Sequence, residues 1–192
     1  MKLKTIILLT ALFCANNCVS QNVLSQKALW SAIGTTHLVN SKNNEKIVLS
    51  KNTAFVFLSP ECPLCKNYML VLNNLVKTYP QVNIVGIIPG KSYTAKVIKE
   101  FGIEYEAQFN LYLDQDKALT KLLLAKTTPE TVLLDQLGNI RYRGLIDNWQ
   151  ATLGVKRKVI TDHYLENALK KITSKNYTYT ETNPVGCRIN DL

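Results

Sequence analysis

The sequence lacks a Gly- or Pro-rich tract, an internal repeat and an apolar run long enough to cross a bilayer as an ordinary helix. The absence of biased tracts argues against a disordered or low-complexity protein. Apolar residues make up 46% of the 192 residues and charged residues 19%, which is the composition of a folded globular chain. This length predicts one domain of ordinary size.

The sequence also lacks a basic motif interleaved with aromatic residues, although its net charge is +9. The lysines are spread along the chain, and the densest basic cluster is Lys156, Arg157 and Lys158. Charges distributed in this way indicate a solvated surface rather than a nucleic-acid site. We therefore predict no nucleic-acid partner.

The first twenty residues have the pattern of a secretory signal peptide. Lys2 and Lys4 precede a short apolar run over residues 5–13, and Ser20 offers a small residue for cleavage. We therefore predict that residues 1–20 are a signal peptide and that the protein is exported, to the periplasm or the extracellular space, with no membrane span after cleavage. An uncleaved anchor and a lipid attached to a leader cysteine are the alternatives.

Removal of the leader changes both the charge and the cysteine count. The net charge falls from +9 to +7, because two of the 23 basic residues leave and all 14 acidic residues stay. Three of the five cysteines remain, namely Cys62, Cys65 and Cys187. An oxidising compartment allows a close pair of cysteines to form a disulfide, and the third cysteine then needs its own explanation.

Apolar runs and helical spacings predict that strands and helices alternate after a polar lead-in over residues 21–44. The predicted strands cover residues 47–49, 54–58, 82–88, 111–113, 131–135 and 140–145, and the predicted helices cover residues 62–79, 92–101, 116–124 and 161–172. Ser92 and Thr161 are the expected N-caps, and Gly102 is the expected stop of the second helix. This order predicts an α/β domain over residues 45–173, with a central mixed sheet, parallel in its first part, an antiparallel edge and helices on both faces.

Cys62 and Cys65 lie where the predicted buried strand meets the first long helix. A thiol at a helix N-terminus lies beside unpaired backbone N–H groups and the positive end of the helix dipole, which lower its pKa. Cys62 is therefore the candidate nucleophile. Cys65 lies one turn further into the helix and should be less exposed, which suits a resolving thiol.

The Cys-x-x-Cys spacing alone also fits half of a metal site or two inert buried thiols. A closed structural zinc site would need two more ligands. The chain after the leader offers only Cys187, His37 and His163 as strong ones, none of them in a second paired spacing. The spacing therefore favours a redox pair over structural zinc.

Three segments together are more specific than the cysteine spacing. Residues 55–65 read FVFLSPECPLC, residues 127–129 read TTP directly before ETVLLD at residues 130–135, and residues 138–144 read GNIRYRG. With these segments the chain resembles the thioredoxin-like superfamily, and within it the exported redoxin and thiol-disulfide oxidoreductase branch. The resemblance covers about residues 45–173 and implies a thioredoxin-like fold.

The resemblance implies a role for each motif residue. Cys62 would be the attacking thiol and Cys65 the resolving thiol of a catalytic pair. Pro129 would be a cis-proline lying against the disulfide, which would leave the backbone of Thr128 free to pair with an extended substrate segment. Protein thiols or disulfides would be the substrates, with an unidentified redox partner. No metal or organic cofactor is implied, and we expect a monomer.

Two positions depart from the thioredoxin pattern. Val56 stands where thioredoxins carry a buried acid that helps to move the proton off the resolving thiol, and Glu61 stands where they carry an aromatic residue. These departures argue against efficient general reduction of many substrates.

Two other activities remain as alternatives. A thiol peroxidase would use a Pro-x-x-x-Thr-x-x-Cys motif, which residues 60–62 do not supply, and Arg143 is interpreted as a surface residue of an exposed hairpin. A copper-binding redoxin-like metallochaperone would use Cys62, Cys65 and His163, because thiolates and imidazole suit copper. Proteins of that type space their cysteines four apart, whereas the spacing here is three and His163 begins a predicted helix.

Cys187 lies in the tail over residues 174–192, which we expect to run extended over the domain. Pro184 and Gly186 indicate a shaped turn before Cys187, and Arg188 would help to stabilise a thiolate. A structural thiol, an intermolecular disulfide and a thiol that reaches the Cys-x-x-Cys pair are the three interpretations. We hypothesise the last, with Cys187 as an additional redox or metal-binding thiol.

Overall fold

The computed structural model describes residues 26–43, 46–48, 51–174 and 176–190. The predicted signal peptide, residues 1–20, lies outside these residues. No helix among the residues that the structure describes is both long and apolar enough to cross a membrane.

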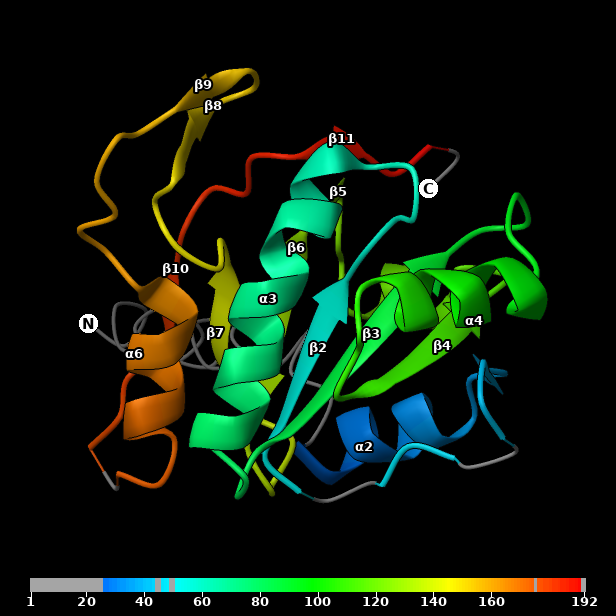
Figure 1. The fold of residues 1–192 in the computed structure, drawn as a ribbon. Helices are drawn as coiled ribbons and strands as arrows, with labels where there is room; N and C mark the ends of the chain where they lie inside the picture. Colours follow the sequence, from blue (N-terminus) through cyan, green and yellow to red (C-terminus); the bar gives the residue numbers. More distant parts are fainter. Residues whose placement is uncertain (1–25, 44–45, 49–50, 175, 191–192) are drawn as a thin grey trace, which may run out of the picture.

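A seven-stranded mixed sheet forms the centre of the molecule (Figure 1). Its strands, in spatial order, are β1 (Val39–Asn40), β4 (Asn110–Asp114), β3 (Asn83–Pro89), β2 (Thr53–Phe57), β6 (Glu130–Leu134), β7 (Ile140–Gly144) and β10 (Thr180–Glu181). The neighbours β4, β3 and β2 are parallel, β2, β6 and β7 are antiparallel, and β10 runs parallel to β7. The predicted α/β fold with a parallel first part is therefore confirmed.

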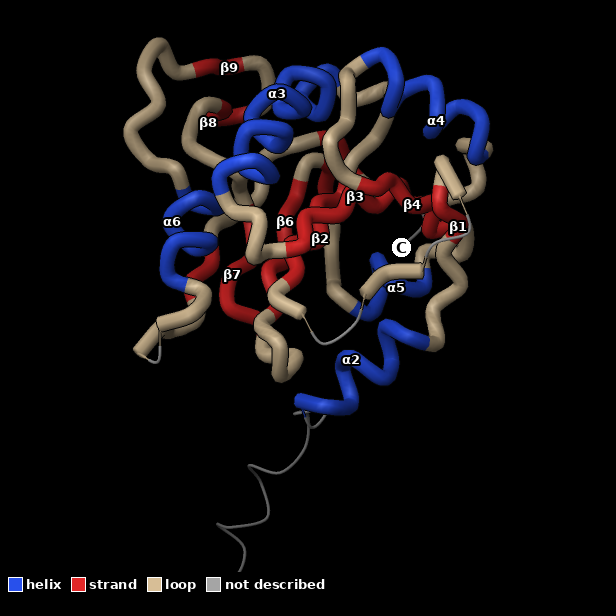
Figure 2. The backbone as a smooth tube through the Cα atoms, turned by 60° about the horizontal axis from the view of Figure 1, so that its bottom comes forward, coloured by secondary structure: helices blue, strands red, loops and turns tan. Residues whose placement is uncertain are grey.

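Helices cover both faces of the sheet, as predicted (Figure 2). They are α2 (Gln26–Gly34), α3 (Pro63–Thr78), α4 (Ala95–Glu104), α5 (Ala118–Leu122) and α6 (Tyr164–Lys171). Helices α3, α4 and α6 lie on one face, and α2 and α5 lie on the other. Because side chains alternate along a strand, Val56 of β2 packs in the core under α3, whereas Phe55 and Phe57 pack in the core with Trp30 of α2. A strand buried on both faces explains the continuous apolar run in β2.

The start of the domain differs from the prediction. Residues 47–48 form no strand, and Leu49 lies outside the described residues. The edge strand is instead β1, which pairs antiparallel with β4 and comes from the segment interpreted as a polar lead-in. In that same segment, Trp30 of α2 donates a hydrogen bond to the Asp135 carbonyl at 3.1 Å. A strand of two residues has no hydrophobic period, so the sequence pattern does not reveal it.

Three helices also have boundaries that differ from the prediction. Helix α4 begins after Thr94 rather than Ser92, because the Thr94 hydroxyl accepts the Val97 N–H at 3.3 Å. Gly102 lies inside α4, where a Cβ would be 3.1 Å from Leu111, so it allows close packing on β4 instead of ending the helix. Helix α6 begins after His163, and the N–H of Thr161 pairs with the Asn148 side chain. Helix α5 is shorter than predicted, at Ala118–Leu122.

Four short strands lie outside the predicted strands. Strands β8 (Gln150–Thr152) and β9 (Val155–Lys156) form a small hairpin. Strand β5 (Thr127–Thr128) pairs antiparallel with β11 (Cys187–Arg188). The tail therefore crosses the domain as predicted, and Figure 1 shows β11 lying beside β5 and near the start of α3.

Candidate functional site

The first turn of α3 carries the two cysteines of the sequence motif. Cys62 is the N-cap residue, with an extended backbone, and Pro63 occupies the first turn, where its missing N–H removes no helix hydrogen bond. In the loop after β2, the Cys62 N–H donates a hydrogen bond to the Ser59 carbonyl at 3.1 Å, which forms a tight turn before the helix. The strand and the helix thus hold Cys62 at the end of the sheet where the cavity opens.

The sulfur of Cys62 is surrounded by groups that stabilise its thiolate. Its pKa falls to about 5, chiefly because the Cys65 thiol hydrogen bonds to it; burial opposes this, and the Cys187 thiol and the backbone N–H groups of Leu64 and Cys65 also lower it. When protonated, the Cys62 thiol donates to the Thr128 carbonyl, with a sulfur to oxygen distance of 3.3 Å. The direction of this shift agrees with that expected for a thiol at a helix N-terminus, although a neighbouring thiol is its largest cause.

Cys65 is kept as a neutral thiol. Burial raises its pKa well above the ordinary value, and the neighbouring Cys62 thiolate raises it further. The Ser59 N–H contacts its sulfur at 3.4 Å. Cys65 is fully buried and Cys62 is 2% exposed, so the order of exposure agrees with the prediction but both thiols are inside. The pair therefore holds one thiolate and one protonated thiol side by side.

The segment around Pro129 lies against the cysteine pair, as the resemblance implied. The Thr128–Pro129 peptide bond is cis, and Thr128 is buried. The expectation that the Thr128 backbone is free to pair with another strand is wrong, however. Thr128 already pairs with Cys187 in the ladder between β5 and β11, because the chain's own tail runs along this edge.

Cys187 lies against Cys62, as hypothesised from the sequence. Burial and the Cys62 thiolate raise the Cys187 pKa to about 11, and the Cys187 thiol hydrogen bonds to the Cys62 sulfur. Arg188 was expected to stabilise a Cys187 thiolate, but Arg188 is exposed and the Cys187 pKa moves upward. The net effect of the site is to keep Cys187 protonated while Cys62 carries the negative charge.

Glu130 and Arg143 support the loop that carries Thr128, and sequence reasoning missed both. Arg143 is 12% exposed at its side chain and lies 3.8 Å from Glu130, which is 2% exposed, so its interpretation as an exposed surface residue is wrong. The second carboxylate oxygen of Glu130 accepts the N–H groups of Lys126 at 2.8 Å and Thr127 at 3.0 Å. An acid directly after Pro129, at the start of an apolar strand, was the only signal in the sequence.

The structure does not assemble the proposed copper ligands. Among the described residues, no group of three or more His, Cys, Asp and Glu side chains is placed to hold a metal. His163 is the exposed N-cap of α6, and His37 is exposed on the lead-in. Cys62 and Cys65 lie together without either histidine.

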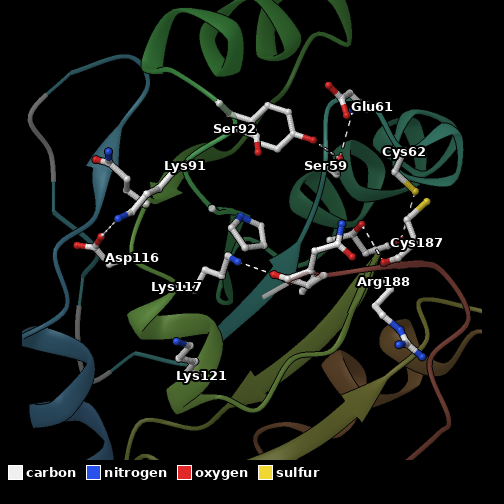
Figure 3. A pocket seen from close by; sticks show the side chains of 17 residues that line it. Ser59, Glu61, Cys62, Lys91, Ser92, Asp116, Lys117, Lys121, Cys187 and Arg188 are labelled. Carbon is white, nitrogen blue, oxygen red and sulfur yellow. Dashed lines mark hydrogen bonds and ion pairs between the residues drawn. The ribbon is translucent and has the colours of Figure 1, made fainter. Parts of the chain in front are cut away.

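A cavity of about 660 Å³ opens at the cysteine pair (Figure 3). Both Cys62 and Cys187 line it, together with Thr128. Its charged lining residues are Lys91, Lys117, Lys121, Arg188, Glu61 and Asp116. Cations therefore outnumber acids around a thiolate, in a space large enough for a short peptide segment.

The rate at which iodoacetamide alkylates Cys62 in the reduced protein is expected to be level between about pH 6 and 8. Because the Cys62 pKa is lowered to about 5, the thiolate is lost only as the pH falls through that value, and the rate should then drop about tenfold per pH unit. Mass spectrometry of the alkylated peptides gives the rate for Cys62 alone. Free cysteine is the control, and its rate should climb up to about pH 8.5. A Cys62 rate that still climbs from pH 7 to 9 would contradict the lowered pKa.

One family model matches most of this region. Residues 36–143 match the model of the AhpC/TSA family, which is more than half of the chain and includes both Cys62 and Cys65. A search of curated proteins finds no match.

Several solved structures share the fold. An uncharacterized conserved protein from Geobacillus kaustophilus aligns with a TM-score of 0.68 and 22% identity, over 79% of this chain and 86% of that one. A hypothetical protein from Sinorhizobium meliloti aligns with a TM-score of 0.64 and 22% identity, over 73% of this chain and 79% of the other. The MTB protein DsbF, solved in mixed oxidized and reduced forms, aligns with a TM-score of 0.56 and 18% identity, over 79% of this chain and 100% of DsbF. The fold is therefore thioredoxin-like.

Proposed function

This chain belongs to the AhpC/TSA family, and on that premise we propose that it is an exported thiol-disulfide oxidoreductase whose Cys62–Cys65 pair exchanges a disulfide with protein thiols. One observation carries the proposal. At the start of α3, a Cys62 thiolate with a pKa of about 5 lies against a Cys65 thiol whose pKa is raised. Nucleophilic attack and resolution need this combination of one ionised and one protonated thiol.

The reaction proceeds through a mixed disulfide. The Cys62 thiolate attacks one sulfur of a substrate disulfide, so that a bond forms between Cys62 and the substrate while the other substrate sulfur leaves as a thiolate. Cys65 then loses its proton and attacks the Cys62 sulfur, which forms the Cys62–Cys65 disulfide and releases the second substrate thiol. Oxidation of a substrate dithiol follows the same steps in reverse.

The low pKa of Cys62 favours the reduced state of the cysteine pair, so that the Cys62–Cys65 disulfide accepts electrons from substrate thiols. Lowering a thiol pKa from 9 to 5 raises the thiolate fraction at pH 7 about 100-fold, but it lowers the intrinsic nucleophilicity by about 40- to 100-fold, so the two effects nearly cancel. What remains is stabilisation of the reduced state, in which Cys62 is ionised. The pair is therefore proposed to oxidise substrate thiols more readily than thioredoxin does.

The environment of Cys65 supports the same direction. Val56 is fully buried at the position where thioredoxins carry an acid that helps to remove the proton from the resolving thiol. Burial of the thiol is the largest cause of the raised pKa of Cys65. Attack by Cys65 on a mixed disulfide is therefore slow, which disfavours rapid general reduction of substrates.

The proposal is tested by redox titration of the chain with Cys14 and Cys18 replaced by serine, so that Cys62, Cys65 and Cys187 are its only thiols. The protein is equilibrated across glutathione buffers, alkylated and mapped by mass spectrometry. We expect a reversible two-thiol step that links Cys62 to Cys65, with a midpoint about 50 mV above the roughly −270 mV of thioredoxin, because the Cys62 pKa is about two units lower. If Cys62 and Cys65 stay reduced at every glutathione ratio, the proposed function is wrong.

A further inference from the structure

The tail of the chain occupies the edge of β5 beside the cysteine pair. Strand β11 pairs antiparallel with β5, with Cys187 opposite Thr128 and Arg188 opposite Thr127. An extended peptide that docks beside a sheet edge uses the same kind of backbone pairing. The ladder next to the cysteine pair is thus already filled by a segment of this chain.

Several contacts hold the tail in this place. Gly186 lies so close to β5 that a Cβ would be 2.3 Å from the Thr128 carbonyl oxygen, and only glycine fits there. On one side of β11, the Ile189 N–H donates to the Lys126 carbonyl at 2.9 Å, and the Ile189 side chain is 7% exposed in the core. On the other side, the Thr182 hydroxyl accepts the Leu145 N–H at 2.8 Å. The tail is therefore anchored at both ends of the short strand.

The pairing brings a third thiol to the nucleophile. Cys187 hydrogen bonds to Cys62, both residues line the cavity, and Figure 3 shows the two side chains pointing toward each other. A substrate peptide bound along β5 would present its sulfur to Cys62 from the same strand. Cys187 thus stands where the reacting cysteine of a substrate would stand.

We propose that β11 is an internal substrate strand, which occupies the peptide-binding edge of β5 and exchanges its Cys187 with the Cys62–Cys65 disulfide. This proposal rests on the proposed function. In the oxidised protein, Cys187 loses its proton and attacks the Cys62 sulfur, so that the Cys62–Cys187 bond forms as the Cys62–Cys65 bond breaks. Cys65 leaves as a thiolate and takes up a proton. The number of disulfides is unchanged, and no external oxidant or reductant is needed.

The internal strand has a consequence for external substrates. A peptide that needs the backbone of Thr128 must first displace Cys187 and Arg188 from β5. The tail therefore competes with substrates, and segments that pair weakly with β5 are excluded from the site.

The first test traps the internal disulfide in a Cys65→Ser variant that also carries Cys14→Ser and Cys18→Ser. The serine hydroxyl can still donate a hydrogen bond to the Cys62 sulfur, and only Cys62 and Cys187 remain as thiols. Oxidised glutathione forms a mixed disulfide with Cys62, and Cys187 then displaces glutathione. Peptide mapping without reductant should find most of the protein as a Cys62–Cys187 disulfide, because an intramolecular thiol has a high effective concentration.

The Gly186→Ala variant tests the strand position with every reactive thiol kept. The new Cβ collides with backbone atoms of Thr128 and Pro129, so β11 should leave the edge of β5. In the Cys65→Ser background, we expect the yield of the Cys62–Cys187 disulfide to fall at least about fivefold, with glutathione left on Cys62 instead. With Cys65 present, the rate of exchange with an external peptide disulfide should rise several-fold. The exposed Asn183→Ala change in the same tail is the matched control and should alter neither readout.

The outcomes separate this inference from the proposed function. If Cys62 of the Cys65→Ser variant carries only glutathione and Cys187 stays free, the internal substrate strand is refuted, while a reversible Cys62–Cys65 step in the parent chain still supports the oxidoreductase. If the Gly186→Ala change does not raise the rate of exchange with an external peptide disulfide, the proposal that β11 occupies the substrate edge is also refuted. Loss of the Cys62–Cys65 step in the parent chain instead refutes the function itself.

Discussion

Replacement of Cys62 by serine is expected to lower the rate of disulfide exchange at pH 7 by at least about a hundredfold. The reason is that the two other thiols near Cys62, those of Cys65 and Cys187, are mostly protonated at this pH. Burial is the largest cause of the raised pKa of both Cys65 and Cys187, and burial remains when Cys62 is replaced, so both thiols stay mostly protonated at pH 7. A serine hydroxyl supplies neither a thiolate nor a leaving group.

The measurement is the reduction of a fluorescent peptide disulfide by the reduced protein, followed under single-turnover conditions. The Cys65→Ser variant is the matched comparison, since it keeps Cys62 and should still form the first mixed disulfide, which then accumulates on Cys62 or passes to Cys187. If the Cys62→Ser chain retains more than a tenth of the parent rate, another thiol is the nucleophile, and the assignment of Cys62 falls.

Replacement of Glu130 by alanine is expected to lower the free energy of unfolding by about 3–5 kcal/mol. Glu130 is 2% exposed, and its removal leaves the mostly buried Arg143 guanidinium without its carboxylate. It also leaves the backbone N–H groups of Lys126 and Thr127 without their acceptor. Unpaired buried charges and unpaired buried donors are among the costliest defects in a folded protein.

Urea unfolding of the reduced protein at pH 7 gives the free energy. The control is Glu100→Ala, which breaks the exposed pair between Lys96 and Glu100 and should cost less than about 1 kcal/mol. Because Glu130 supports the loop that carries Thr128, its loss should also reduce the fraction of Cys62–Cys187 disulfide in the Cys65→Ser background. A Glu130→Ala chain that unfolds at the same urea concentration as the parent would show that the buried pair contributes no stability.

Much of the fold follows from local patterns in the chain. The apolar runs over residues 54–58 and 82–88 correspond closely to β2 and β3, because strands buried on both faces need continuous apolar sequence. The helix at Pro63–Thr78 follows from apolar residues at helical spacing and from Pro63 in its first turn. These features depend on residues that are close together in sequence, and the pattern therefore predicts them well.

The prediction was weakest where a contact joins distant segments through few residues. Strand β1 has two residues, and nothing in their sequence distinguishes them from a loop until β4 lies beside them. Arg143 looks like a surface residue of a hairpin, yet the neighbouring strand places Glu130 next to it. In both cases the partner is supplied by packing, which a local pattern does not contain.

The sequence by itself determined the α/β order and the position of Cys62 at the start of a helix, because these depend on hydrophobic period and on the groups of one helix end. Only the tertiary structure decided that Cys187 faces Cys62 and that β11 fills the edge of β5. Cys187 and its strand partner Thr128 are 59 residues apart in the sequence. Pairing of a two-residue strand depends on the close approach of Gly186 and on anchors in β7 and the core. Those contacts exist only once the sheet has formed, and they determine which thiol meets the nucleophile.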